Sequence, residues 1–260
     1  TKIKMKNLKN KVVFITGATS GIGKACAVDF AKLGANILIC GRRADRLEKT
    51  ANEIHKKYKV KVFAFELDVR NYDDVKEAIE ILPKEWKKIE VLVNNAGLSR
   101  GLNKIQEGVL SDWEEMLDTN VKGLLYVTKC VLPLMLKHKR GHIINIGSIA
   151  GREIYPGGNV YCASKSAVDY ITKGMRVDLI DKGIKVSTVD PGLVNTEFSL
   201  VRYHGDKDRA KSTYKGLKPL TGKDIAEVVI FVATRDENLN IAQVTVFPKA
   251  QASATISYRK

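Results

Sequence analysis

The sequence lacks any uninterrupted apolar run close to the roughly 20 residues that a helix needs to span a bilayer. Residues 1–13 are rich in lysine and hold no apolar stretch of the kind that defines a secretory signal. With 260 residues, of which 44% are hydrophobic, the chain can build one large core. We therefore expect a soluble cytoplasmic protein that forms a single domain over residues 1–260.

Cysteine is also scarce, and its spacing excludes two common uses. The chain has no C-x-x-C pair and no histidine at ligand spacing from a cysteine, which argues against a zinc site and against a disulfide framework. We expect no metal site and four free thiols: Cys26, Cys40, Cys130 and Cys162.

Acidic residues are few relative to basic ones, with 29 Asp and Glu against 44 Lys and Arg, and the formal net charge is +15. Such an excess attracts polyanions. The lysines are nevertheless scattered over many segments, without an arginine stripe or a series of aromatic residues that could stack on bases. We interpret them as solvated faces and expect no specific nucleic-acid partner.

Short β-branched runs alternate with longer amphipathic stretches, the pattern of βαβ units. It predicts an α/β fold, a Rossmann-type doubly wound parallel sheet of about seven strands with helices on both faces. Right-handed crossovers then leave a ligand crevice at the carboxyl ends of the strands. The expected strands are 12–16, 36–40, 60–66, 89–93, 142–147, 184–189 and 241–247. The expected helices are 21–33, 44–58, 72–82, 159–182 and 223–234, with two more over 111–138 that separate near Pro133.

One long segment, about 191–221, has no strand periodicity and contains Gly192, Gly205, Gly216 and Pro219. Long connections in compact domains often carry function. We expect this segment to be a lid or substrate loop.

A glycine-rich turn joins the first expected strand to the first expected helix, with the sequence TGATSGIG over residues 16–23. Glycines let backbone N–H groups approach a pyrophosphate, and the positive end of the helix stabilises its charge. The turn predicts a dinucleotide site that includes Gly17, Thr19, Ser20, Gly21, Ile22 and Gly23.

The second expected strand ends in Arg42 and Arg43 rather than in a carboxylate. A carboxylate there would bind the 2′-hydroxyl of NAD, whereas guanidinium groups bind a phosphate through forked hydrogen bonds. The pair favours NADP (NADPH) over NAD as cofactor. The alternative is that both arginines only solvate the start of a helix.

Tyr161 and Lys165 are four residues apart in an expected helix, so their side chains share one face. A nearby ammonium favours the phenolate, which lets a tyrosine relay a proton near neutral pH. Ser148 follows the preceding strand and could hydrogen-bond the reacting oxygen. A tyrosine and a lysine at this spacing are also common by chance.

Together these residues resemble the classical short-chain dehydrogenase/reductase family over nearly the whole chain. The likeness rests on residues 16–23, Leu67-Asp68-Val69, Asn94 to Gly97, Asn120, Ser148, Tyr161 to Lys165, and Pro191-Gly192 with Thr196.

The resemblance implies a role for each of these positions. It implies Asn120, Ser148, Tyr161 and Lys165 as the catalytic set, with Asn120 holding a water that links Lys165 to solvent. It places Asp68 at the adenine, Lys165 on the nicotinamide ribose, and Val194 and Thr196 near the carboxamide. The remaining implied cofactor residues are Val69, Asn95, Ala96, Gly97, Pro191 and Gly192.

The second half of the chain is similar to the serine 3-dehydrogenase branch of that family, which includes allo-threonine and 3-hydroxy acid dehydrogenases. This likeness rests on residues 151–158, 191–203 and 242–253. This likeness implies a homotetramer that acts on small 3-hydroxy acids such as L-serine, L-allo-threonine or 3-hydroxyisobutyrate. Arg152 and Arg202 could each clamp a substrate carboxylate, and Tyr155 could close the pocket. A surface or interface ion pair is an equal alternative for each arginine.

Two other functions remain open at this point. The same machinery suits an NADPH-dependent malonic semialdehyde reductase or general carbonyl reductase. A non-catalytic NADP-binding regulatory protein is an alternative of another class, although it would not need the complete catalytic set.

Overall fold

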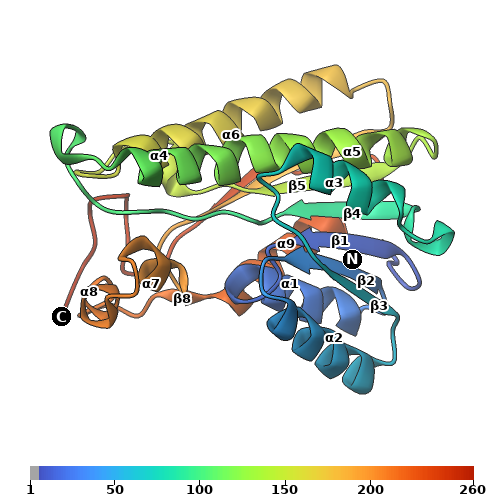
Figure 1. The fold of residues 1–260 in the computed structure, drawn as a ribbon, viewed down its shortest axis with the longest axis horizontal. Coiled ribbons are helices and arrows are strands. Elements are labelled where there is room, and N and C mark those ends of the chain that lie inside the picture. The colour runs from blue at the N-terminus through green and yellow to red at the C-terminus, as the bar shows by residue number, and fades with distance from the viewer. Residues whose placement is uncertain (1–5) are drawn as a thin grey trace.

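Seven parallel strands form a central sheet between two layers of helices in the computed structural model, which describes residues 6–260 (Figure 1). The spatial order of the strands is β3-β2-β1-β4-β5-β6-β9, as a doubly wound sheet requires. Their bounds are β1 Val12–Thr16, β2 Asn36–Gly41, β3 Val62–Glu66, β4 Ile89–Asn94, β5 Gly141–Ile146, β6 Ile184–Pro191 and β9 Gln243–Val246. The predicted fold class is confirmed.

Two hydrophobic clusters hold the sheet between its helical layers. Successive side chains of a strand point to opposite faces, so Val13 and Ile15 of β1 join one cluster and Val12 and Phe14 join the other. Every residue of β1, β4 and β5 is buried, as expected of strands covered on both sides. In the sheet, β1 lies between β2 and β4, so the chain continues on one side of β1 and later returns to its other side. This change of side leaves a crevice at the carboxyl ends of the central strands.

The helices divide between the two faces (Figure 1). One layer holds α1 Gly21–Lys32, α2 Ala44–Tyr58 and α9 Gly222–Ala233. The other holds α3 Tyr72–Glu80, α4 Leu110–Leu117, α5 Leu124–Leu136 and α6 Asn159–Asp178. Short 3₁₀ turns cover Lys84–Trp86, Ile105–Glu107 and Ile149–Gly151.

The expected separation of two helices near Pro133 is wrong. α5 continues through Pro133, and the change occurs earlier, in a π-helical turn at Asp118–Gly123 that joins α4 to α5. Proline removes one helical hydrogen bond, but the buried side chains of Val127, Val131 and Met135 hold α5 against the sheet on both sides of it. Packing therefore outweighs the local propensity.

The segment 191–221 is more regular than its sequence indicates. Two short strands, β7 Val194–Asn195 and β8 Leu220–Thr221, pair at its base. Between them lie α7 Phe198–Arg202 and α8 Lys207–Ser212, which are too short to produce a readable helical period. The Tyr214 hydroxyl donates to the Val194 carbonyl at 2.8 Å and so holds the segment to its own base.

Within residues 6–260, no helix is long and apolar enough to cross a membrane. The same residues contain no cluster of three or more His, Cys, Asp or Glu side chains that could hold a metal ion.

Candidate active site

A cavity of about 730 Å³ lies at the carboxyl ends of the strands, the position predicted for the ligand crevice. It extends from the glycine-rich turn, past Arg42 and Arg43, to the start of α6 and the segment 191–221. Most of the predicted site residues line it: Gly17, Thr19, Ser20, Gly21, Ile22, Arg42, Arg43, Asp68, Val69, Asn95, Ala96, Gly97, Ser148, Tyr155, Tyr161, Lys165, Pro191, Gly192, Val194, Thr196 and Arg202. Gly23, Asn120 and Arg152 do not line it.

The glycine-rich turn has the close packing that a cofactor cradle needs. Gly17 has φ +65°, and a Cβ there would lie 2.9 Å from the Ala96 Cα. Asn95 holds the turn by donating from Nδ2 to the carbonyls of Thr16 and Gly17 at 2.9 and 3.1 Å. A Cβ on Gly23 would lie 2.5 Å from the Gly17 carbonyl oxygen, so Gly23 packs against the turn instead of facing the cavity. The cradle fits a pyrophosphate at the start of α1.

Arg43, which follows β2, has its guanidinium group held beside this cradle by hydrogen bonds. Arg43 donates to the Thr19 hydroxyl through Nη2 at 2.6 Å and to the Ser20 hydroxyl at 3.1 Å. Arg42 is more exposed and lies 3.3 Å from the Glu115 carboxylate. Positive charge beyond the pyrophosphate position suits the 2′-phosphate of NADP.

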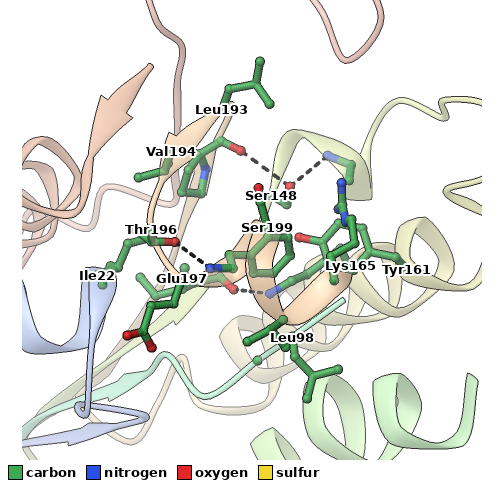
Figure 2. A pocket seen from close by; sticks show the side chains of 18 of the residues that line it. Ile22, Leu98, Ser148, Tyr161, Lys165, Leu193, Val194, Thr196, Glu197 and Ser199 are labelled. Carbon is green, nitrogen blue, oxygen red and sulfur yellow. Dashed lines mark hydrogen bonds between the residues drawn. The ribbon is translucent and has the colours of Figure 1, made fainter. Parts of the chain in front are cut away.

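Ser148, Tyr161 and Lys165 lie close together on one side of the cavity, while Ile22, Thr196 and Glu197 lie on the other (Figure 2). Ser148 follows β5, and its Oγ accepts from the Ala150 N–H at 3.1 Å. Tyr161 is in the first turn of α6, and Lys165 follows one turn later. Lys165 Nζ donates to the Ile146 carbonyl at 2.9 Å, which ties α6 to the end of β5.

Burial dominates the electrostatics of this group. It raises the pKa of Tyr161, while the positive charge of Arg202 and a hydrogen bond with Ser148 lower it. Burial lowers the pKa of Lys165 to about 8, and the negative charge of Asp190 partly offsets that change. The positive charge of Arg202 therefore acts on Tyr161, a contribution that the sequence did not lead us to expect.

Asn120 does not line the cavity, but its side chain holds the backbone beside the candidate catalytic residues. It lies in the π-helical turn, accepts from the Leu98 N–H at 2.8 Å and donates to the Leu98 carbonyl, also at 2.8 Å. A Cβ on Gly97 would lie 3.1 Å from Asn120 Oδ1 and 3.5 Å from Lys165 Nζ. Asn120 thus fixes the chain after β4 directly beside Lys165, and its implied role in holding a water stays a prediction.

The two arginines considered for substrate binding have different surroundings. Arg152 Nη2 lies 2.8 Å from Asp169 and 3.2 Å from Asp190, and the residue does not line the cavity. Arg202 lies in the cavity, where it donates to the hydroxyls of Tyr155 and Ser99 at 2.9 and 3.1 Å. The structure brings Arg202 and Tyr155 to the candidate active site and leaves Arg152 outside it.

Several cavity residues were not anticipated from the sequence. The C-terminal segment lines the cavity through Gln251, Ser253 and Arg259, and Gln251 Oε1 accepts from the Leu193 N–H at 2.8 Å. Ser199 and Glu197 come from the segment 191–221. The sequence assigned no role to these residues, because their place in the cavity depends on contacts between distant parts of the chain.

Residues 11–205 match the family profile described as short chain dehydrogenase. The chain belongs to this family of oxidoreductases, as its motifs led us to expect.

A relative from Schizosaccharomyces pombe, named NADP-dependent 3-hydroxy acid dehydrogenase, is 46% identical, with 98% of this chain and 99% of the relative covered. Sulfoacetaldehyde reductase 2 from Chromohalobacter salexigens is 41% identical over 93% of this chain and 95% of its own. The structure titled as the closed form of serine dehydrogenase complexed with NADP+ is 40% identical, with a TM-score of 0.89 and coverage of 96% of this chain and 99% of that chain.

Proposed function

We propose that the protein uses NADP to oxidise small 3-hydroxy acids, such as L-serine, L-allo-threonine or 3-hydroxyisobutyrate, and catalyses the reverse reduction. The chain is an NADP-dependent oxidoreductase of the short-chain dehydrogenase family that acts on CH–OH groups. The relatives' names and the surroundings of Arg202 support the narrower proposal.

The position of Arg202 carries the proposal. Its guanidinium carbon lies 5.3 Å from the Tyr161 ring centroid, and its hydrogen bonds within residues 6–260 go to hydroxyl groups. Those bonds use two of the five N–H groups of the side chain, which leaves three for a ligand. In a 3-hydroxy acid, one carbon separates the carboxylate from the carbon that bears the hydroxyl. A short molecule of this kind can reach both Arg202 and Tyr161.

In the oxidising direction, Tyr161 accepts the proton of the substrate hydroxyl and Ser148 donates a hydrogen bond to the same oxygen. NADP, which the glycine-rich turn, Arg42 and Arg43 would hold, would supply the hydride acceptor for this oxidation. Lys165 adds positive charge that favours the phenolate form of Tyr161. Arg202 holds the substrate carboxylate, and Asn120 keeps the chain beside Lys165 in place.

A second candidate is the reduction of a small anionic carbonyl compound, for which malonic semialdehyde is the first to test. The observation that favours it is the raised pKa of Tyr161, caused mainly by burial, because a protonated phenol is ready to donate to a carbonyl. General reduction of neutral ketones has less support, since a neutral substrate offers no carboxylate to the remaining N–H groups of Arg202. A purely regulatory role is set aside because the chain belongs to a family of oxidoreductases.

The test compares 3-hydroxyisobutyrate with its methyl ester, using NADP and the NADPH absorbance band. In Arg202→Met we expect the KM for the acid to rise about 10- to 100-fold, the usual value of a charge-assisted hydrogen bond. The KM for the ester should stay within about threefold. Tyr161→Phe is the control for the chemistry and should lose turnover of both substrates. Equal KM changes for acid and ester would contradict a carboxylate site at Arg202.

A further inference from the structure

Glu197 forms ion pairs with two arginine side chains at the end of the cavity opposite the candidate catalytic residues. Its Oε2 lies 2.7 Å from Arg43 Nη1, and its Oε1 lies 2.5 Å from Arg46 Nη1. Arg43 and Arg46 belong to the end of β2 and the start of α2, whereas Glu197 belongs to the segment 191–221. Figure 2 shows the Glu197 carboxylate directed away from Ser148 and Lys165.

The position that Glu197 takes on Arg43 is one that an anion of the cofactor would need. Arg43 has its Nε and Nη2 groups on the hydroxyls of Thr19 and Ser20, so its Nη1 edge is the part that remains for an anion. The Glu197 carboxylate accepts a hydrogen bond from Arg43 Nη1 and so occupies that edge. A carboxylate and a phosphate cannot use the same N–H groups at once, and two like charges at this distance repel each other.

The carboxylate is ionised in this setting. Burial raises the pKa of Glu197, but hydrogen bonds from Arg43 and Arg46 more than offset it, so the pKa is lower than usual. Two arginines and one glutamate leave one net positive charge, too little to neutralise a dianionic phosphate. Removing the glutamate charge would leave two.

Glu197 is also the residue that precedes α7, the helix that ends at Arg202. One turn and a half of helix therefore joins the arginines at the adenosine end to the guanidinium beside Tyr161. A ligand that displaces Glu197 must release the first residue of this connection.

We propose that Glu197 competes with the 2′-phosphate of NADP for Arg43 and Arg46, and that binding of the phosphate detaches the start of α7. Glu197 is then a determinant of cofactor specificity, since it weakens the binding of NADP and leaves NAD unaffected. The proposal rests on the NADP dependence above, and it does not depend on which hydroxy acid is the substrate.

The first test measures equilibrium binding of NADP, NAD, adenosine 2′,5′-bisphosphate and 5′-AMP to wild type and Glu197→Gln by calorimetry at fixed ionic strength. We expect the Kd of the two ligands with a 2′-phosphate to fall about five- to tenfold in the variant. The Kd of NAD and of 5′-AMP should stay within about twofold. Glu53→Gln is the matched control, because it removes one charge from α2, where Glu53 contacts Lys24 and not Arg43.

Unchanged or weaker binding of NADP by Glu197→Gln would overturn the proposal, as would equal tightening of NAD. Equal tightening by Glu53→Gln would reduce the effect to net charge and would also overturn it. None of these readings requires turnover, so failure of the hydroxy acid assignment would leave them intact.

The second test follows hydrogen exchange of the backbone amides of residues 197–203. In wild type, saturating adenosine 2′,5′-bisphosphate should speed exchange at the start of α7 relative to saturating 5′-AMP. In Glu197→Gln the two ligands should give the same exchange. Slower exchange with the bisphosphate in wild type would refute detachment.

Discussion

The sequence allowed Arg152 either to bind substrate or to form an ion pair, and its contacts in the structure predict a role in stability. Its guanidinium joins Asp169 of α6 to Asp190 at the end of β6, with N–O distances of 2.8 and 3.2 Å. The two aspartate side chains are 9% and 3% exposed. Arg152→Met retains most of the side chain's length and removes the charge, so both carboxylates lose a partner.

The expected cost follows from the burial of these groups. Removing one partner of a fully buried ion pair costs about 3–5 kcal/mol. Here the Arg152 side chain is 29% exposed, Asp169 keeps Lys173 at 2.7 Å, and Asp190 keeps the side chain of Gln243. We therefore expect the free energy of unfolding to fall by about 2 kcal/mol.

Urea unfolding at pH 7 and one fixed protein concentration measures this loss. With an m-value of about 2 kcal/mol/M, the midpoint should fall by about 1 M. The KM for a 3-hydroxy acid should stay within about twofold, in contrast to Arg202→Met. A normal midpoint with a large rise in the acid's KM would refute this reasoning and return Arg152 to the substrate site. Asp190→Asn in the same background should restore part of the stability, because it removes one unpaired charge.

Two further predictions concern pH, and one concerns assembly. Burial lowers the pKa of His142 to about 3, so the unfolded chain binds its proton first as pH falls, and stability is lost from about pH 6.5 downward. From pH 7 to pH 5 this histidine should cost about 2 kcal/mol, measured as the difference in urea unfolding between wild type and His142→Gln; equal acid losses in both would contradict it. The charge of Lys165 stabilises the phenolate that Tyr161 becomes when it donates its proton. Because the pKa of Lys165 is about 8, kcat/KM for carbonyl reduction should therefore fall as pH rises through that value. Lys165→Arg should move the fall to higher pH, since guanidinium keeps its proton, and an unmoved limb would assign it to another group. The homotetramer implied by the family likeness is checked by light scattering, where a monomer would refute it.

The strands were predictable because each is a short run rich in β-branched or other apolar residues between turns, and the central strands are buried throughout. The sequence prediction of 12–16 matches β1, and 44–58 matches α2, since in both places local preference agrees with packing. The π-helical turn at 118–123 was not predictable, because its residues have no pattern that distinguishes it from an ordinary helix. Asn120 in this turn bonds both backbone groups of Leu98, which lies 22 positions earlier, and no local pattern indicates this contact.

The candidate site also combines residues whose positions were predictable from the sequence with residues whose positions were not. Ser148, Tyr161 and Lys165 are close in sequence, so their spacing and the strand before them predict their meeting. Arg152 and Arg202 could not be distinguished, because the residues that decide between them lie far away along the chain. Asp190 is 38 positions from Arg152, and Ser99 is 103 positions from Arg202.

The proposed catalytic groups and the proposed substrate-binding group come from different parts of the chain, and this predicts how function can change in such a protein. The groups proposed to act on the reacting oxygen are fixed by β5, which is fully buried, and by the buried face of α6, which includes Tyr161 and Lys165. The group proposed to recognise the substrate comes from the segment 191–221, which is held at its base by the β7–β8 pair and by a few hydrogen bonds of Tyr214 and Gln251. Substitutions in that segment can therefore move Arg202 while α6 still holds Tyr161. They should change KM for the acid most, with a smaller effect on kcat through the positive charge that Arg202 places beside Tyr161. A shared reaction with differing substrates is what such an arrangement allows, and relatives named for a hydroxy acid and for sulfoacetaldehyde share 46% and 41% of their residues with this chain.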